Sequence, residues 1–487
     1  MHVLAIDQGT TGTTCLIVNE RHEVVARAYR EFPQSYPQPG WVEHDPDAVW
    51  SSVTQTIKAC LEAAPGVDIA AIGITNQRET TVVWERSTGD PIYPAIVWQC
   101  RRTHALCEEL KARGLEADFR ARTGLVLDPY FSGTKVRWIL DHTGSQARAQ
   151  AGDLAFGTID SFLIHRLTAG RVHATDTTNA SRTLLMNLES GAWDNWCLDQ
   201  LNLPHEMLPE IRACDAYFGV TQGVPGLPDG LPIHGVLGDQ QAALFGQACF
   251  ARGDAKCTYG TGAFLLCNVG EQPIHSKNGL LATPAWNLGG TITYALEGST
   301  FIAGAAVQWL RDELGLIERA PDIEALAASV EDADGVTFVP ALAGLGAPHW
   351  RAEARGALFG LTRGTNRAHI ARAVLDGIAL QIVDLLDAMA ADSGAPLQRL
   401  RVDGGAAANN LLMQIQSDLL KVVIDRPPML EATGLGAALI AGLGAGVIPS
   451  IEALERRWSA ERQFTPRRDD AWRQDQKARW LVATQSC

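Results

Sequence analysis

Two stretches with the same pattern, half a chain apart, constrain the fold of this chain more than any other feature. Residues 3–18 form an apolar run, a turn rich in Gly and Thr, and a second apolar run. Residues 256–269 repeat that order around a turn at 259–262. A hairpin that recurs in this way predicts two similar halves that face each other. We therefore divide the chain into an N-terminal domain, residues 1–248, and a C-terminal domain, residues 249–487.

The turn of the first hairpin, residues 7–12, combines groups that suit a phosphate. Its glycines let the backbone approach a bound group and point amides at an anion, and its threonine hydroxyls add donors without charge. Asp7 ends a buried strand, where a carboxylate can hold a magnesium ion or its waters. The second turn has no Asp and offers no metal ligand. Each turn by itself is also consistent with an ordinary Gly/Thr hairpin.

Length, charge and hydropathy exclude several classes of protein. At 487 residues the chain is long for one hydrophobic core, which favours two domains. Its net charge of −14 argues against a nucleic-acid partner, which would require a basic face. It has no apolar run of about 18 residues and no basic segment followed by an apolar run at its start, so we expect neither membrane insertion nor a leader. The Ala-, Leu- and Gly-rich segment 434–448 is too short to span a membrane and predicts a buried helix.

The cysteines indicate a reducing compartment. The chain has 10 of them, none in a Cys-x-x-Cys pair, and several lie inside apolar runs. Such residues behave as small buried hydrophobic groups rather than as disulfides or zinc ligands. We therefore expect a cytoplasmic protein.

Helical and strand-like segments alternate along the N-terminal half. A helix is predicted from Asp45 or Pro46 to about residue 63, followed by a strand at 69–74. That strand ends at the polar cluster 75–80, and another strand follows at 81–84. This alternation predicts an α/β domain with its functional residues at strand ends.

Two adjacent charges, Arg78 and Glu79, stand at the end of one predicted strand. A guanidinium donates and a carboxylate accepts, and a polyol requires both because every hydroxyl gives and takes a hydrogen bond. The alternative is a surface ion pair of little consequence. Trp98 and Tyr130 lie beside polar loops, where a ring either fills the core or covers the carbon chain of a small ligand.

Three further positions have the setting of ligand contacts. Asp239 follows a strand at 233–237 and opens an apolar helix, so it is either the N-cap of that helix or a group at the ligand-binding edge of the sheet. Gly304 lies at a predicted helix start, where a nucleotide could approach. Residues 400–410 form a strand, a Gly-Gly turn and a helix, which suits a phosphate or ribose contact.

Motifs along nearly the whole chain, in order, resemble those of the FGGY carbohydrate kinase family. The most specific are the strand end Asn76-Gln77-Arg78-Glu79-Thr80 and the segment Gly238-Asp239-Gln240-Gln241. The other matching segments are 6–11, 130–138, 259–262, 360–364 with 369–376, and 403–405 with 409–410.

The resemblance implies an α/β, two-domain actin-like ATPase (ribonuclease H-like) fold with an interdomain cleft. It implies a kinase that phosphorylates a small polyol, glycerol, with ATP and Mg²⁺. The resemblance makes Asp239 the general base, and Asp7 and Asp239 the metal ligands. The substrate residues would be Arg78, Glu79, Trp98, Tyr130, Asp239, Gln240 and Phe264. The ATP residues would be Thr10, Thr11, Gly12, Thr261, Gly304, Gln308, Gly405 and Asn409. We expect a homo-dimer or homo-tetramer.

Two alternatives stay open at this point. One is a kinase for another polyol or a ketose, because the size of the pocket is not visible in a sequence. The other is an actin-like ATPase without sugar chemistry, either a filament protein or a chaperone, although such a protein needs no hydroxyl clamp of the kind that Arg78 and Glu79 would form. The chain also departs from the pattern at Thr14, where members with similar motifs commonly carry an Arg, so we expect weaker nucleotide binding when metal is absent.

Overall fold

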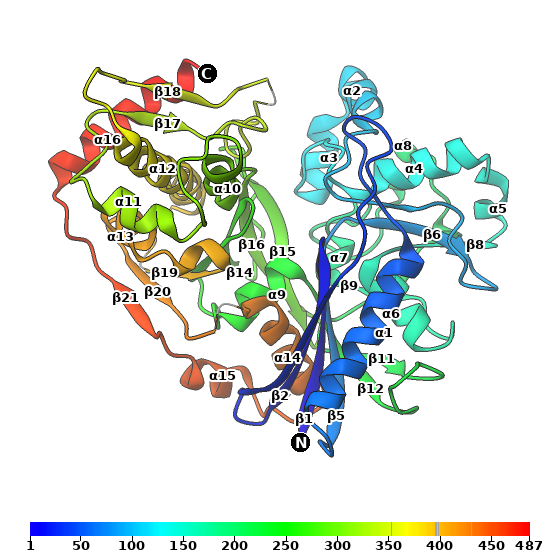
Figure 1. Cartoon of the computed structure of the whole chain (residues 1–487). Coiled ribbons are helices and arrows are strands. Elements are labelled where there is room, and N and C mark those ends of the chain that lie inside the picture. Colours follow the sequence, from blue (N-terminus) through cyan, green and yellow to red (C-terminus); the bar gives the residue numbers. More distant parts are fainter. Residues whose placement is uncertain (352, 395–396, 398, 430) are drawn as a thin grey trace.

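The computed structural model describes residues 1–351, 353–394, 397, 399–429 and 431–487. The chain forms two α/β lobes, one from each half, on either side of a central group of long strands (Figure 1). Each lobe is built around one mixed sheet.

The first sheet has the order β11-β12-β5-β1-β2-β3 within the described residues. Strands β1 and β2 pair antiparallel and form the predicted first hairpin, while β1, β5 and β12 run parallel. The bounds are β1 His2–Gln8, β2 Gly12–Asn19, β3 Val24–Glu31, β5 Ile69–Asn76, β11 Tyr217–Val220 and β12 Pro232–Gly238.

The second sheet repeats this plan in the order β15-β16-β14-β13-β19-β20-β21 among the described residues. Strands β13 and β14 form the second hairpin, and β13, β19 and β20 run parallel, as β1, β5 and β12 do in the first sheet. The two halves are therefore similar, as the repeated hairpin predicted. The bounds are β13 Ala255–Tyr259, β14 Ala263–Gly270, β15 Leu281–Leu288, β16 Thr291–Thr300, β19 Arg399–Asp403, β20 Val423–Arg426 and β21 Arg462–Phe464.

The parallel strands of the first sheet bring the predicted site residues to one edge. Asp7 pairs with Thr75 across β1 and β5, and Asn76 pairs with Gly238 across β5 and β12. Since the carboxyl ends of parallel strands share an edge, Arg78 and Asp239 emerge there beside the first Gly/Thr turn.

Two helices cover opposite faces of this sheet because the residues of β1 alternate. Leu4 and Ile6 pack into the cluster that contains residues of α1 (Pro46–Ala63), whereas Val3 and Ala5 pack against α14 (Ala432–Gly444). Helix α1 begins where predicted, with Asp45 as the N-cap that accepts a hydrogen bond from the backbone N of Asp47.

Helix α14 is the buried helix that the sequence predicted, but it belongs to the N-terminal sheet in space. It packs so closely on β5 that a Cβ added to Gly73 would lie 2.1 Å from the carbonyl oxygen of Ala437. Similarly, a Cβ on Gly436 would lie 1.9 Å from the carbonyl oxygen of Ala242 in α9 (Asp239–Gly246). A helix of the second half therefore packs against β5 and α9 of the first half.

The remaining elements surround these sheets, and the predicted strand at 81–84 lies in a separate sheet of order β4-β7-β6-β8.

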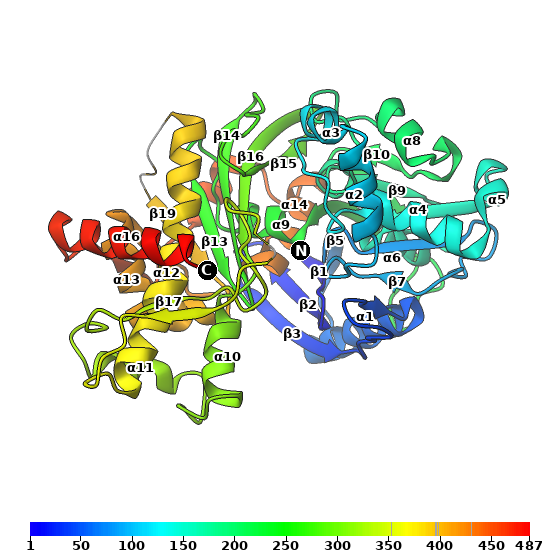
Figure 2. The same ribbon diagram turned by 90° about the horizontal axis from the view of Figure 1, so that it is seen from above.

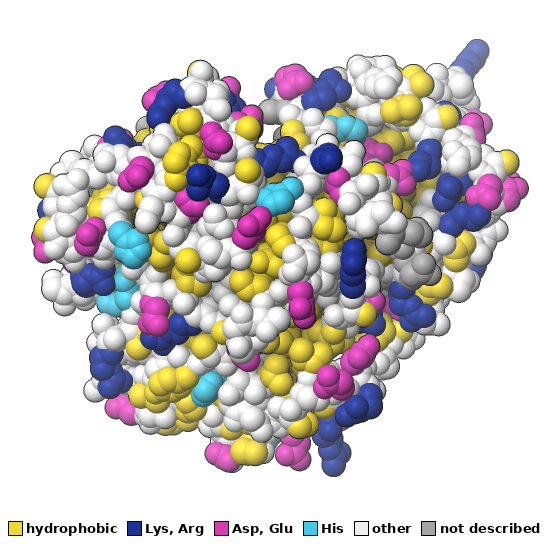
Figure 3. All heavy atoms as spheres, turned by 180° about the vertical axis from the view of Figure 1, so that it is seen from behind, with side chains coloured by type: hydrophobic (Ala, Val, Ile, Leu, Met, Phe, Trp, Pro, Cys, Tyr) yellow, Lys and Arg dark blue, Asp and Glu magenta, His cyan; other side chains and the backbone are white. Residues whose placement is uncertain are grey.

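No helix among the described residues is long and apolar enough to cross a membrane. The face opposite to that of Figure 1 carries basic side chains interspersed with acidic ones (Figure 3). The bounds in the first half are β4 Glu43–His44, β6 Thr81–Glu85, β7 Ala95–Ile96, β8 Leu154–Thr158, β9 Ala174–Asp176, β10 Glu210–Arg212, α2 His104–Ala112, α3 Glu116–Thr123, α4 Ser132–Thr143, α5 Gln146–Gln150, α6 Ile159–Leu167, α7 Thr177–Ala180, α8 Asn195–Leu201 and η1 His205–Met207. Those in the second half are α10 Gly304–Asp312, α11 Asp322–Ala328, β17 Thr337–Val339, β18 Ala357–Phe359, α12 Arg367–Ser393, η2 Gly405–Ala408, α13 Asn410–Leu420, α15 Ile451–Arg457 and α16 Asp470–Gln485.

Candidate active site

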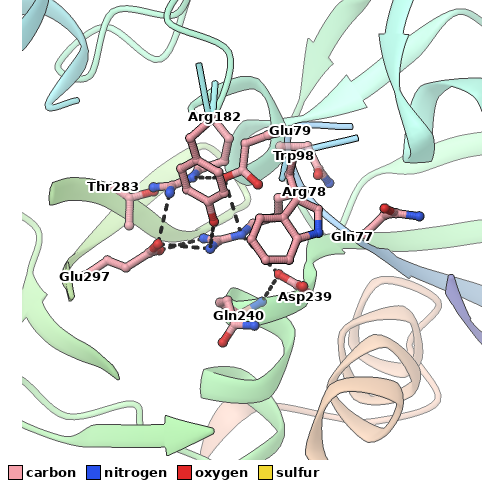
Figure 4. A network of polar contacts seen from close by, with 12 residues as sticks. Gln77, Arg78, Glu79, Trp98, Arg182, Asp239, Gln240, Thr283 and Glu297 are labelled. Atoms are coloured by element: carbon pink, nitrogen blue, oxygen red, sulfur yellow. Dashed lines mark hydrogen bonds and ion pairs between the residues drawn. The ribbon is translucent and has the colours of Figure 1, made fainter. Parts of the chain in front are cut away.

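Arg78 lies at the centre of a buried group of charges just beyond the end of β5 (Figure 4). Its Nε is 3.1 Å from Oδ1 of Asp239, and its two Nη atoms donate to the carboxylate of Glu297 at 2.6 and 3.0 Å. The side chain is 2% exposed. A buried guanidinium requires such partners, and the result is that its orientation is fixed.

Glu79 is held in an unusual backbone conformation with φ of +60°. A non-glycine residue adopts this region only when its surroundings hold it there. Here Oγ of Ser132 and Nζ of Lys135 donate to the carbonyl oxygen of Glu79 at 3.0 and 3.1 Å. Burial lowers the pKa of Lys135 to about 7, with the charge of Glu79 acting in the opposite direction. Because Arg78 and Glu79 are both buried, their interpretation as a surface ion pair is wrong.

The carboxylate of Glu79 has one oxygen in use and one available. Nε of Arg182 donates to Oε1 at 2.7 Å. Within the described residues no hydrogen bond reaches Oε2 of Glu79. This oxygen can accept a hydrogen bond from a ligand hydroxyl.

Asp239 is the first residue of α9, and the N-cap is Gly238, so the N-cap alternative for Asp239 is wrong. The backbone N of Gln240 donates to its Oδ1 at 2.7 Å, and Oδ2 accepts no hydrogen bond from the described part of the chain. Burial raises the pKa of Asp239, and the charges of Arg78 and Lys256 oppose that rise. The side chain is 31% exposed.

Three aromatic rings stand together beside these charges. The ring centroid of Trp98 is 5.7 Å from that of Tyr130 and 6.3 Å from that of Phe264. The indole N–H of Trp98 also donates to Oγ1 of Thr10 at 2.9 Å, so this ring is hydrogen-bonded to the first Gly/Thr turn. The hydroxyl oxygen of Tyr130 lies 3.5 Å from Nη2 of Arg78. The rings can therefore cover the carbons of a ligand whose hydroxyls face the charges.

Gln240 lies next to Asp239 but its side chain is already engaged. Nζ of Lys256, on β13, donates to Oε1 of Gln240 at 2.5 Å and to Oγ1 of Thr258 at 2.9 Å. Burial lowers the pKa of Lys256, and the charges of Asp403 and Asp239 oppose that change. The contact joins the N-terminal end of α9 to the sheet of the other half.

Glycine is required in the first Gly/Thr turn and at the start of α10, which contacts the second turn. A Cβ on Gly12 would lie 2.7 Å from the carbonyl oxygen of Arg30, and one on Gly304 would lie 2.6 Å from the carbonyl oxygen of Gly260. The backbone N of Gly304 donates to that same oxygen at 2.9 Å, so the start of α10 rests on the second turn. Thr11 of the first turn and Thr261 of the second turn are exposed.

The predicted adenosine residues lie on α10 and around the Gly-Gly turn. Gln308 is exposed on α10, one turn after Gly304, and a Cβ on Gly405 would meet no atom within 4 Å. The predicted helix after the glycine pair is instead a 3₁₀ turn, η2, followed by α13. Asn409 caps α13 by accepting a hydrogen bond from the backbone N of Leu412 at 2.9 Å.

Residues of both Gly/Thr hairpins line an acidic cleft. Its volume is about 400 Å³. Figure 2 shows the strands of the two hairpins, β1 with β2 and β13 with β14, near the centre of the molecule. Burial, and then the charges of Asp239 and Glu431, raise the pKa of Asp7 to about 7. The lining residues are Asp7, Thr14, Leu16, Thr258, Asp403, Gly404, Gly405, Glu431, Thr433 and Gly434.

The structure adds four buried charged residues that the sequence analysis did not assign to the site: Lys135, Arg182, Lys256 and Glu297. Arg182 lies just after the short helix α7. Glu297 stands alone in the apolar run 294–298, and a single charge inside a strand pattern was a signal that it is paired. Their partners could not be found from the sequence, since Arg78 and Glu297 are 219 residues apart.

Two similar α/β halves, each with a Gly/Thr hairpin facing a common cleft, define the actin-like ATPase fold, as predicted. Residues 2–246 match the N-terminal domain, and residues 255–445 the C-terminal domain, of the FGGY family of carbohydrate kinases. The chain belongs to this family.

Relatives and solved structures agree with the assignment. The chain is 57% identical to a glycerol kinase of Myxococcus xanthus, over 99% of this chain and 99% of the relative, and 54% identical to one of Ralstonia nicotianae, over 99% and 97%. The structure resembles that of Plasmodium falciparum glycerol kinase with ADP, with a TM-score of 0.94 and 37% identity over 100% of this chain and 98% of that one. A gluconate kinase of Lactobacillus acidophilus shares the fold at 22% identity, with a TM-score of 0.90 over 100% and 98% of the two chains.

Proposed function

We propose that this chain transfers the terminal phosphoryl group of ATP to glycerol and yields sn-glycerol 3-phosphate. The observation that carries the proposal is the position of Asp239. Its Oδ2 accepts no hydrogen bond from the described residues, and its Oδ1 lies 3.1 Å from Nε of the buried Arg78, next to Glu79 in the sequence. The full-length relatives named glycerol kinase, and the Plasmodium glycerol kinase solved with ADP, support the choice of substrates.

The clamp supplies complementary partners for a polyol. Nε of Arg78 points toward Asp239 and donates to a hydroxyl, while Oε2 of Glu79 accepts from one. The Tyr130 hydroxyl and the Gln240 amide lie beside them. Trp98 and Phe264 cover the three carbons, which favours a short polyol over a pentulose.

Asp239 acts as the general base in this proposal. Its Oδ2 takes the proton of the attacking hydroxyl as the new O–P bond forms and the bond between the γ-phosphorus and its bridging oxygen breaks. The electron pair of the broken bond leaves with ADP. Burial keeps the carboxylate more basic than a free aspartate, which favours proton transfer near neutral pH. The rest of the rate enhancement comes from positioning and charge neutralisation.

A magnesium ion fits the donor set of the cleft. Carboxylate and hydroxyl oxygens line it, and Mg²⁺ is bound in kinases by one or two carboxylates together with substrate phosphates and waters. No three His, Cys, Asp or Glu side chains in the described residues form a complete metal site by themselves. Asp7 and Asp239 would hold the ion. It supplies positive charge to the phosphates, which the acidic lining does not.

The two Gly/Thr turns hold the phosphates from either side. Thr10, Thr11 and Gly12 offer hydroxyls and amides from the first half, and Thr261 does so from the second. Gly304, Gln308, Gly405 and Asn409 would receive the nucleoside, because the glycines leave room beside the start of α10 and η2.

Two further properties are part of the proposal. All 10 cysteines are unpaired and nine are buried, which supports a reducing cytoplasmic location. We also expect a homo-dimer or homo-tetramer; light scattering of the purified chain at micromolar concentration would give a monomer mass if that expectation is wrong.

A substrate panel tests the function. Purified protein with Mg-ATP is assayed for ADP release with glycerol, erythritol, xylulose and gluconate in separate reactions. We expect kcat/KM for glycerol to exceed the others by at least about a hundredfold, since each misfitted or unpaired hydroxyl costs about 1–3 kcal/mol. A higher kcat/KM for one of the longer substrates would contradict the proposal.

A further inference from the structure

Glu297 is a buried carboxylate of the second half that accepts hydrogen bonds from two arginines. It is 0% exposed on β16, and three N–H groups donate to it. Arg78 contributes Nη1 to Oε2 at 2.6 Å and Nη2 to Oε1 at 3.0 Å, and Nη2 of Arg182 donates to Oε1 at 2.9 Å. A buried carboxylate is costly unless it is paired in this way. Burial alone would raise the pKa of Glu297, but the two guanidiniums lower it to about 2.

The partners of Glu297 all come from the other half of the molecule. Arg78 and Arg182 are residues of the first half, whereas β16 lies in the second sheet between β14 and β15. Leu266 of β14 pairs with Glu297, and β14 begins directly after the second Gly/Thr turn, residues 259–262. Beyond β16 the chain leads to Gly304 at the start of α10. The carboxylate therefore stands on the sheet that carries the predicted nucleotide residues.

The contacts of Glu297 determine how the clamp faces its ligand. By holding both Nη atoms of Arg78, it leaves only Nε directed at Asp239. By holding Nη2 of Arg182, it aims Nε of Arg182 at Oε1 of Glu79, so that Oε2 stays available. Figure 4 shows the two arginines converging on Glu297, with Asp239 on the opposite side of Arg78.

We propose that Glu297 is a positioning residue for substrate binding: from the second half, it fixes the guanidinium of Arg78 directly and the carboxylate of Glu79 through Arg182. This inference rests on the proposed phosphorylation of a polyol. Loss of the Glu297 charge lets the Arg78 guanidinium turn toward Asp239 and Glu79, where it takes the acceptors that glycerol requires. The nucleotide contacts, on other residues of the cleft, keep their arrangement.

The test compares Glu297→Gln with a matched control. Asp376→Asn removes another buried carboxylate of the second half. It accepts from Nε of Arg372 at 3.0 Å within α12 and, among the described residues, forms no hydrogen bond or ion pair with a residue of the site. Steady-state kinetics give KM for glycerol and for ATP separately, and calorimetric titration with ADP confirms that each variant is folded. We expect Glu297→Gln to raise KM for glycerol at least tenfold and KM for ATP less than twofold. Asp376→Asn is expected to change neither KM.

The outcomes separate this role from a purely structural one and from a wrong substrate. An unchanged KM for glycerol in folded Glu297→Gln, or an equal rise in both KM values, would overturn the proposal. If the wild type prefers another polyol, the same comparison is made with that polyol. The KM for that polyol must then rise in Glu297→Gln. An unchanged KM refutes the positioning role whatever the substrate is. If Glu297→Gln does not fold, Arg182→Lys replaces it, because a lysine keeps the charge but cannot reach both carboxylates as a guanidinium does. A normal KM for the polyol in Arg182→Lys would then overturn the proposal.

Discussion

Replacing Asp239 with Asn removes the proposed base and leaves the surrounding structure in place. The Asn side chain keeps an oxygen that can accept the 2.7 Å hydrogen bond from the backbone N of Gln240. Arg78 loses its 3.1 Å ion pair but keeps the two hydrogen bonds to Glu297. We therefore expect an unchanged melting temperature and only a few-fold rise in KM for glycerol.

The expected loss lies in kcat. General-base assistance contributes roughly 10²- to 10⁴-fold, which corresponds to about 3–5 kcal/mol of activation free energy. Oδ2 of Asp239 is the carboxylate oxygen that no hydrogen bond from the described residues occupies, so that full contribution is assigned to it. ADP release coupled to NADH oxidation, at saturating glycerol and Mg-ATP, measures kcat for both proteins. A kcat for Asp239→Asn within threefold of the wild-type value would refute the general-base role.

Three other substitutions or conditions test separate parts of the account. Glu79→Gln should raise KM for glycerol about tenfold and change kcat less, because it removes the negative charge of the clamp carboxylate that Arg182 holds. A large fall in kcat with an unchanged KM in steady-state kinetics would be inconsistent with a binding role. The pKa of Glu297 is lowered from 4.5 to about 2, so at neutral pH its ionised form contributes about 3 kcal/mol of stability, which is lost as pH falls from 4.5 through 2. The difference in urea unfolding free energy between wild type and Glu297→Gln should therefore be smaller at pH 3 than at pH 7, and an equal difference would argue against the ion pairs. Asp7, Asp403 and Glu431 line the cleft, and Thr14 adds no positive charge to it. ADP should therefore bind at least tenfold more weakly in EDTA than in Mg²⁺. Equal affinities in calorimetric titrations would count against the metal site.

The sequence predicted those features that depend on neighbouring residues. Helix α1 begins at Pro46 after the Asp45 cap and ends at Ala63, since capping and apolar spacing act within a few residues. The two Gly/Thr hairpins were recognised because Gly and Thr in a turn between apolar runs are a local pattern. The placement of Arg78 and Asp239 at one edge followed from the rule for parallel strands.

The features that were missed depend on contacts between distant segments. The partners of Glu297 lie 219 and 115 residues away, and no periodicity in the sequence connects them. Helix α14 was predicted as buried, but only the packing at Gly73 and Gly436 shows that it lies on the sheet of the other half. The strand at 81–84 was predicted correctly, yet its position in the separate sheet β4-β7-β6-β8 depends on its partner β8, whose residues 154–158 lie far along the chain.

The measurement that tests the central claim most directly is the dependence of ATP turnover on glycerol. Purified protein with Mg-ATP is assayed for ADP, with and without glycerol, and the product is identified with an sn-glycerol 3-phosphate-specific dehydrogenase. We predict that glycerol raises ADP release by at least about a hundredfold, since the attacking hydroxyl and its base are assembled only when the clamp is filled, and that one sn-glycerol 3-phosphate forms per ADP. ATP hydrolysis that proceeds at the same rate without glycerol, or ADP release with no sn-glycerol 3-phosphate, would contradict the account.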